Sequence, residues 1–289
     1  MNIQGVIPAL VTPFDDKEQV DFQALRKLIN HLIEEGADGF YVGGSTSECF
    51  LLTTEERREV LRVAIEETAG RVPVIAHIGE MSTAKAAALA EYATQLGASA
   101  VSSVPPFYYK YSFDELAQYY NDICSVTHLP MIVYSIPSLS GVSFTADNLK
   151  KILENKQIQG LKYTSYDLFE LEKIHRHFPD LKLFNGHDEL LCNALPVGIT
   201  GAIGSTFNIM VKKYKAICAA YQQGDMKTAE DLQHQVNTVT EALIRTDVIR
   251  SVKYILTKKG IPCGNSRRPF SPLNAQEKAF LDDLYGKFF

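Results

Sequence analysis

Short apolar runs alternate with amphipathic stretches along most of the chain, and this alternation is the feature that most restricts the fold. The runs have the length of buried strands, and the stretches between them carry apolar residues at helical spacing. In the stretch from 21 to 35, for example, Leu25, Leu28 and Leu32 fall on one helix face. The pattern therefore predicts successive β-then-α units and a parallel sheet.

The apolar runs predict strands at 5–11, 39–42, 74–78, 100–103, 131–134, 159–163, 182–184 and 202–204. The amphipathic stretches predict helices at 21–35, 54–68, 82–96, 112–126, 145–155, 168–178 and 189–197. Two of these helices begin with a capping box, formed by Thr53 with Glu56 and by Ser112 with Glu115. The remaining third of the chain is expected to be helical at 214–221, 226–244, 248–257 and 275–285, with a Gly- and Pro-rich loop at 260–272.

Eight β-then-α units in about 205 residues fit a (β/α)8 TIM barrel, so the predicted fold class is α/β, a TIM barrel with a C-terminal helical extension. A doubly wound sheet is the competing fold. It usually carries G-x-G-x-x-G after its first strand, where this chain has Gly5 alone. We assign 1–210 to the barrel with its active site and 211–289 to a helical extension packed on the barrel. The length of 289 residues would by itself also allow two domains.

Composition limits the classes of partner. The net charge is −5 and no Lys/Arg run exceeds a pair, so nucleic acid is not expected. No apolar stretch approaches about 18 residues, so no membrane span is expected. Five widely spaced cysteines without C-x-x-C, and a start without the basic residues of a signal peptide, favour a cytoplasmic protein with free thiols. The seven histidines lack ligand spacing with carboxylates, so no metal site is expected.

Reacting groups in such a barrel lie at the C-terminal ends of the strands. Lys162 belongs to the sixth predicted strand, which should point alternate side chains into the barrel. Burial favours the neutral form of an amine, and a neutral amine attacks a ketone to form a Schiff base. The alternative is a lysine at a strand end that reaches solvent.

Three further groups are candidates for the same end of the barrel. Tyr134 ends the neighbouring strand, where its hydroxyl can relay a proton beside an amine. It can equally be a packed core tyrosine. The loop 43–48, G-G-S-T-S-E, suits a carboxylate or phosphate, or is an ordinary Gly-rich turn. Asp188 and Glu189 follow the seventh strand, where they either bind sugar hydroxyls or favour the start of a helix.

Taken together, these residues resemble the pyruvate-dependent, Schiff-base-forming class I aldolases, the family of dihydrodipicolinate synthase and N-acetylneuraminate lyase. The likeness covers nearly the whole chain. Its landmarks occur in order as G-G-S-T-x-E at 43–48, P-P-F-Y-Y at 105–109, Y-x-I-P at 134–137 and G-L-K at 160–162.

The resemblance implies a role for each matching residue. Lys162 would form the imine with the keto acid, and Ser45 and Thr46 would hold its carboxylate. Tyr134 would shuttle the proton, aided by Ser45. Tyr108 would reach toward the site of a neighbouring subunit in a homotetramer. No cofactor is implied, because the protonated imine itself supplies the electrophile.

One position separates the branches of this family. Dihydrodipicolinate synthases carry an arginine two residues beyond the proline of Y-x-x-P, where this chain has Leu139, and a leucine cannot hold a carboxylate. The stretches 184–189 and 204–210 instead resemble the sialic-acid lyases. This likeness implies reversible cleavage of sialic acid to pyruvate and N-acetyl-D-mannosamine. The hydroxyl-rich tail of the sugar would then contact Thr164, Gly186, Asp188, Glu189 and Ser205.

Two departures from the family pattern leave the substrate open. Ser47 stands where the family usually has glycine, which would permit positive φ, so the loop is expected to differ slightly. Tyr163 and Tyr166 stand where sialic-acid lyases usually have smaller or polar residues, and Tyr166 is expected to narrow or line the sugar pocket. The alternatives are another 2-keto acid aldolase or dehydratase of the family, and a non-catalytic barrel that binds a keto acid or sialic acid as a regulator.

Overall fold

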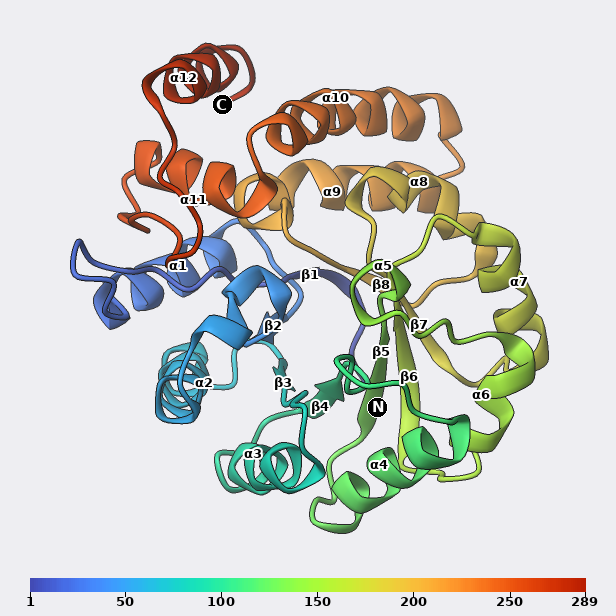
Figure 1. Ribbon diagram of the computed structural model, residues 1–289. Coiled ribbons are helices and arrows are strands. Elements are labelled where there is room, and N and C mark those ends of the chain that lie inside the picture. Colours follow the sequence, from blue (N-terminus) through green and yellow to red (C-terminus); the bar gives the residue numbers. More distant parts are fainter.

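The computed structural model describes all 289 residues and places a ring of strands at the centre of a ring of helices (Figure 1). This arrangement confirms the predicted TIM barrel. The eight strands are β1 (Gly5–Pro8), β2 (Phe40–Val42), β3 (Val74–His77), β4 (Ala100–Ser103), β5 (Met131–Ser135), β6 (Ile158–Tyr163), β7 (Lys182–Asn185) and β8 (Gly201–Gly204).

All paired strands run parallel, in the order β1-β8-β7-β6-β5-β4-β3-β2. A parallel bridge between Ala9 and Tyr41 joins the two ends of this order and closes the ring. The register places Tyr134 of β5 directly opposite Lys162 of β6. Closure therefore brings the ends of all the strands to one rim, where groups far apart in the sequence meet.

Two apolar layers follow from the alternation of side chains along each strand. A small inner cluster fills the barrel and includes Tyr41, Tyr134 and Phe184, whereas a larger outer cluster joins the strands to the helices. Tyr163 belongs to the outer cluster, and its neighbour Lys162 lies opposite the inner residues Tyr134 and Phe184. The predicted inward orientation of Lys162 is thus explained by the period of two.

The outer ring consists of α1 (Phe22–Glu34), α2 (Thr54–Thr68), α3 (Thr83–Gln95), α4 (Phe113–Ser125), α6 (Ala146–Ile152), α7 (Leu168–His177), α8 (Leu191–Ala194) and α9 (Phe207–Gln222). The two predicted capping boxes are both present. Thr53 with Glu56 begins α2, and Ser112 with Glu115 begins α4. These reciprocal hydrogen bonds satisfy backbone N–H groups that a helix start otherwise leaves without partners.

The strand predicted at 5–11 ends at Pro8 and the helix predicted at 145–155 ends at Ile152, and two other predicted helices differ more from the structure. The stretch 189–197 is not one helix but three short turns, η3 (Asp188–Leu190), α8 and η4 (Leu195–Val197). Pro196 has no N–H to donate, and Gly198 follows at positive φ, so a continuous helix cannot form. The helix predicted at 214–221 begins already at Phe207, and its backbone departs from helical geometry at Met210. The short helix α5 (Pro137–Ser140) was not predicted.

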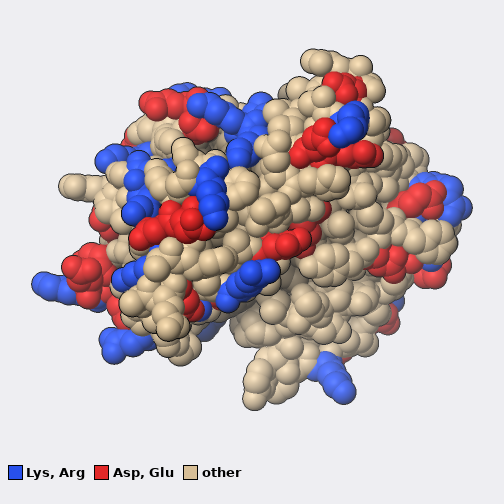
Figure 2. All heavy atoms as spheres, turned by 90° about the horizontal axis from the view of Figure 1, so that it is seen from above, with Lys and Arg blue, Asp and Glu red and all other residues tan.

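The last helices are α10 (Met226–Arg245), α11 (Val248–Lys258) and α12 (Ala275–Phe288). They gather on one side of the barrel, where α10 packs on α9 and α12 lies outermost (Figure 1). α9 also packs on β1, so it completes the ring of barrel helices, and the division at 210 stays a prediction. None of the helices has the length and apolar character needed to cross a bilayer. Acidic and basic side chains are interspersed on the face seen from above (Figure 2).

We predict that Gly201→Ala lowers the free energy of unfolding by about 2 kcal/mol, as overpacking of a core does. An added Cβ would lie 2.6 Å from Gly5 O and 2.7 Å from Gly5 N, and would push apart the β1–β8 pair that helps to close the barrel. Gly286→Ala is the matched control, because its Cβ meets nothing within 4 Å. Urea unfolding of the two variants measures the difference, and equal stabilities would contradict the prediction.

Candidate active site

Lys162 lies inside the barrel between two aromatic faces. Its side chain comes from β6, and the residue is only 4% exposed. The amine Nζ is 4.0 Å from the ring centroid of Tyr134 and 4.3 Å from that of Tyr41. The structure therefore brings the predicted pair of Lys162 and Tyr134 together, and adds Tyr41, which the sequence analysis missed. Its only sequence signal is its position in a strand two residues before Gly43.

His77 of β3 packs beside these rings. Its ring lies 6.1 Å from that of Tyr134 and 5.8 Å from that of Tyr41. Burial, reinforced by the positive charge of Arg57, lowers the pKa of His77 to about 3, so the imidazole is neutral at physiological pH. Nδ1 then donates to Gly43 O at 2.7 Å. This buried histidine therefore fixes the start of the 43–48 loop.

The 43–48 loop contains one turn of 3-10 helix, η1 (Ser45–Ser47). Its positive φ angles lie at Gly43 and Glu48, not at Ser47. The hydroxyl of Ser47 donates to Leu10 O at 2.5 Å and accepts from Gly43 N at 3.2 Å. The serine that replaces the family's usual glycine thus ties the loop to the segment that follows β1.

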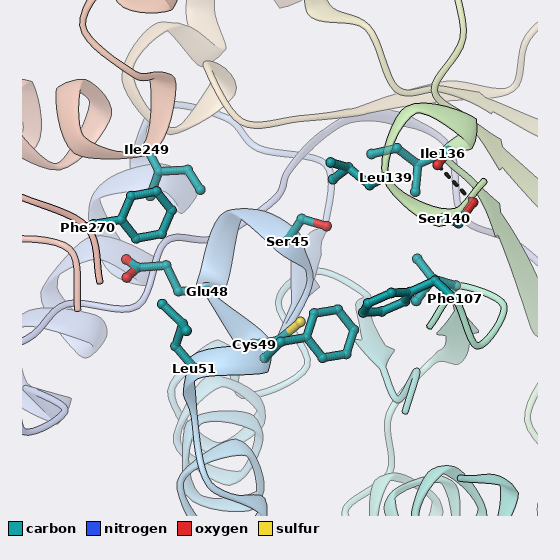
Figure 3. A pocket seen from close by; sticks show the side chains of 12 residues that line it. Ser45, Glu48, Cys49, Leu51, Phe107, Ile136, Leu139, Ser140, Ile249 and Phe270 are labelled. Carbon is teal, nitrogen blue, oxygen red and sulfur yellow. Dashed lines mark hydrogen bonds between the residues drawn. The ribbon is translucent and has the colours of Figure 1, made fainter. Parts of the chain in front are cut away.

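Hydroxyl groups connect this loop with the end of β8. Thr46 Oγ1 lies 2.6 Å from Ser205 Oγ, so the structure joins these two predicted substrate-binding residues directly. Ser45, at the start of η1, lines a pocket of about 340 Å³ at the mouth of the barrel (Figure 3). Most of the other residues that line this pocket are apolar, and the Ser45 hydroxyl is one of its few polar groups.

Two glycines make room for polar side chains at the ends of β6, β7 and β8. A Cβ on Gly186 would lie 1.9 Å from Thr164 Oγ1, and a Cβ on Gly204 would lie 1.9 Å from Asp188 Oδ1. Thr164 Oγ1 is buried and has no hydrogen-bond partner within the chain. A buried hydroxyl without a partner is rare.

Asp188 is buried with its carboxylate held from one side. Thr206 donates to Oδ2 through its backbone N at 2.8 Å and through its hydroxyl at 2.7 Å. Burial raises the pKa of Asp188 to about 6, although the two hydrogen bonds from Thr206 lower it in part. The carboxylate therefore helps to orient the end of β8 as well as being a candidate for sugar contacts.

Glu189 has a different environment, at the rim. Its Oε1 accepts hydrogen bonds from the Tyr166 hydroxyl at 2.8 Å and from His187 Nδ1 at 3.1 Å. The Tyr166 and His187 rings stack with centroids 4.1 Å apart. Tyr166 therefore covers one oxygen of a predicted sugar-binding carboxylate, whereas Tyr163 is buried on the outer side of the barrel.

Tyr108 stands apart from this cluster. It is 78% exposed, and its ring packs edge-to-face on that of Tyr109. The same loop brings Phe107 against Phe50, whose ring centroids are 5.0 Å apart, at the edge of the pocket in Figure 3. Leu139 of α5 lines this pocket too, so its mouth is apolar where a dihydrodipicolinate synthase would place an arginine.

No group of three or more His, Cys, Asp and Glu side chains is arranged to hold a metal ion. The chemistry available to the cluster around Lys162 is that of one amine, phenol hydroxyls, aliphatic hydroxyls and buried carboxylates. Such a set can form and break an imine, because the amine supplies the nucleophile and the hydroxyls can carry protons.

Comparison with known proteins places the chain among related enzymes. The model of the dihydrodipicolinate synthetase family matches residues 2–285. The N-acetylneuraminate lyase of Citrobacter koseri is 44% identical over 98% of this chain and 95% of its own length. The N-acetylneuraminate lyase structure from Fusobacterium nucleatum has a TM-score of 0.95 at 35% identity, covering 99% of each chain. A dihydrodipicolinate synthase from Bacillus anthracis also reaches 0.95, at 30% identity over 99% of this chain and 98% of its own.

We predict a pH-dependent stability difference between the protein and Asp188→Asn. The pKa of Asp188 in the fold, about 6, lies above the ordinary value of 3.8, so the fold favours the protonated carboxyl. Its contribution to stability is fully present below about pH 4 and is lost as pH rises through about 6, by about 3 kcal/mol. Unfolding free energies of both proteins between pH 4 and 7 measure this loss, and a difference that is constant with pH would contradict it.

Proposed function

The chain belongs to the dihydrodipicolinate synthetase family, and from this premise we propose that it is a Schiff-base aldolase that cleaves N-acetylneuraminate reversibly to pyruvate and N-acetyl-D-mannosamine. The observation that carries the proposal is the Lys162 amine, buried between the rings of Tyr134 and Tyr41. The 44% identity with the Citrobacter koseri lyase over 98% of the chain supports the same reaction. The protein is accordingly a carbon–carbon lyase.

The first half of the reaction forms the imine. Lys162 Nζ attacks the C2 ketone of the open-chain sugar, and the resulting carbinolamine loses water to give a protonated imine. The ring of Tyr134 lies against Lys162 Nζ. Its hydroxyl would relay protons from the attacking nitrogen to the carbinolamine oxygen, which leaves as water. Ser45 and Thr46 hold the adjacent carboxylate, which fixes C2 beside the amine.

The second half breaks the carbon–carbon bond. A base removes the proton of the C4 hydroxyl, with Tyr134 as the relay, and the C3–C4 bonding electrons flow into the protonated imine. N-acetyl-D-mannosamine leaves as an aldehyde, and an enamine of pyruvate remains on Lys162. Protonation at C3 and addition of water then release pyruvate and the free amine. The protonated imine acts as the electron sink, so the step needs no cofactor.

The sugar tail accounts for the polar rim. Sugar hydroxyls need hydrogen-bond acceptors and donors, and Asp188, Glu189, Thr164 and Ser205 would provide them. Thr164 lies beside Gly186, and Asp188 lies beside Gly204. The second candidate is an aldolase or dehydratase of the same family that acts on another 2-keto acid, because the Bacillus anthracis dihydrodipicolinate synthase has the same TM-score. Leu139 argues against a substrate with a second carboxylate at that position.

We further propose that the active form is a cytoplasmic homotetramer in which Tyr108 completes the site of an adjacent subunit. Within its own chain Tyr108 is largely exposed, and an apolar pocket with Phe107 and Leu139 opens beside it. Exposed apolar groups gathered around a pocket are typical of an interface between proteins. All five cysteines are free thiols, in keeping with a reducing compartment.

We predict that borohydride with pyruvate fixes a stable adduct on Lys162 and that Lys162→Met abolishes it, because only an imine is reduced to a permanent bond. Peptide mapping by mass spectrometry locates the adduct. Lys182→Met is the control, since Lys182 is the neighbouring lysine one strand away, on β7. Pyruvate release from N-acetylneuraminate, compared with 2-keto-3-deoxy sugar acids, identifies the substrate. An adduct without turnover of any of these would favour the non-catalytic regulator.

We predict that mixing two inactive variants restores activity if Tyr108 acts across the subunit interface. Tyr108→Phe and Lys162→Met each lower kcat by about 100-fold or more. Random exchange of subunits pairs an intact Lys162 with the partner subunit's Tyr108 in about one quarter of the sites of a two-fold interface. Tyr134→Phe mixed with Lys162→Met is the control and stays inactive, because both residues belong to one barrel. Recovery in neither mixture would refute the shared site.

A further inference from the structure

A buried ion pair joins the C-terminal extension to the 43–48 loop. Lys253 of α11 places Nζ 2.7 Å from Glu48 Oε1, and both side chains have no exposed surface. The two residues are 205 positions apart in the sequence. Two charges that leave water together are costly unless their remaining hydrogen-bonding capacity is satisfied. The contacts around this pair are therefore informative.

Both Lys253 and Glu48 make further polar or aromatic contacts besides the ion pair. The other oxygen of Glu48, Oε2, accepts from the backbone N of Arg267 at 2.8 Å. Lys253 Nζ also donates to Asn265 O at 3.1 Å and lies 4.1 Å from the centroid of the Phe14 ring. The carboxylate is thus gripped from two sides by the extension, and the amine is fixed in one position.

Glu48 joins η1 to a second 3-10 turn, η2 (Cys49–Leu51). Its φ of 57° and ψ of 35° lie in the left-handed region, which favours glycine. Its N–H donates to Ser45 O at 2.9 Å and so closes η1. A non-glycine residue keeps this conformation only where its surroundings enforce it. In Figure 3 the Glu48 side chain points toward Phe270 of the extension, while the Ser45 hydroxyl points into the pocket.

The extension does not need Lys253 in order to stay attached. Arg267 already binds Glu56 of α2 through two hydrogen bonds of 2.7 Å, and donates to Leu51 O at 2.9 Å. Lys253 and Glu48 add a contact of another kind, because they reach the turn that carries Ser45 and Thr46.

We propose that Lys253 is a positioning residue for the aldolase reaction: through Glu48 it holds the turn that presents Ser45 and Thr46 to the keto-acid carboxylate. The inference rests on the proposed function. It makes the C-terminal extension part of the binding machinery, although the extension supplies no group to the reacting atoms. Loss of the pair releases the Glu48 turn and moves both hydroxyls away from the carboxylate.

The test measures the pyruvate concentration that half-saturates borohydride trapping on Lys162. This value does not depend on how much of the protein is folded, so it separates positioning from stability. Lys253→Met and Glu48→Gln are each expected to raise it about tenfold or more, since small misplacements of binding groups are costly. Lys215→Met is the control, because Lys215 makes an ion pair of 2.6 Å with Asp38 that also joins α9 to the barrel, away from the loop.

The double variant Lys253→Met/Glu48→Gln separates the two roles further. It leaves no buried charge unpaired, so its melting temperature is expected to recover relative to the single variants. Its half-saturation is expected to stay raised, because the anchor is still missing. Half-saturation that returns with the melting temperature, or that is unchanged in every variant, would overturn the inference. The double variant and Glu48→Gln carry the test if Lys253→Met does not fold, and absence of any adduct in the unsubstituted protein would instead overturn the proposed function.

Discussion

Closure of eight short parallel strands is the constraint on which the rest of the structure depends. Each strand is so short that it sends few side chains inward, and these must fill the barrel without leaving space. Burying a lysine among purely apolar side chains would cost free energy. The faces of Tyr41 and Tyr134 on either side of the Lys162 amine reduce this cost, because aromatic faces attract a cation. The same two rings shield the proposed nucleophile, Lys162 Nζ, from water. They therefore both fill the barrel and surround the amine.

The chain carries a net charge of −5 and yet is proposed to bind an acidic substrate. Overall charge therefore cannot attract this substrate, and groups within the site must do so. The buried carboxylate of Asp188 accepts hydrogen bonds from Thr206, and the half-buried carboxylate of Glu189 accepts them from Tyr166 and His187. Under the proposed function, these carboxylates would face the polyol of the substrate, and the hydroxyls of Ser45 and Thr46 would face its carboxylate. Such an arrangement would favour one orientation of the substrate.

The sequence contained most of the fold because strand and helix periodicities differ and capping boxes mark helix starts. Prediction from the sequence failed where the local pattern of residues does not distinguish between two structures. Pro196 broke a helix whose apolar spacing looked continuous, and Tyr41 in an apolar run was indistinguishable from an ordinary core residue. The structure brings Lys162 and Tyr134 into contact, and separately Thr46 and Ser205, whereas Tyr108 is largely exposed in the single chain. The Glu48–Lys253 pair was beyond local reasoning, because nothing near either residue specifies a partner 205 positions away.

The barrel and its extension are hard to regard as separate units. α9 spans the predicted division at 210 without a linker, although its backbone is kinked and non-helical at Met210. Within the extension, Arg267 binds Glu56 of α2, and Lys253 binds Glu48 of the loop that follows β2. These contacts link the 43–48 loop to helices that follow all eight strands in the sequence. A barrel truncated after α9 would lose Lys253 and Arg267, which hold the Glu48 carboxylate, and with them the anchor of the turn that carries Ser45 and Thr46.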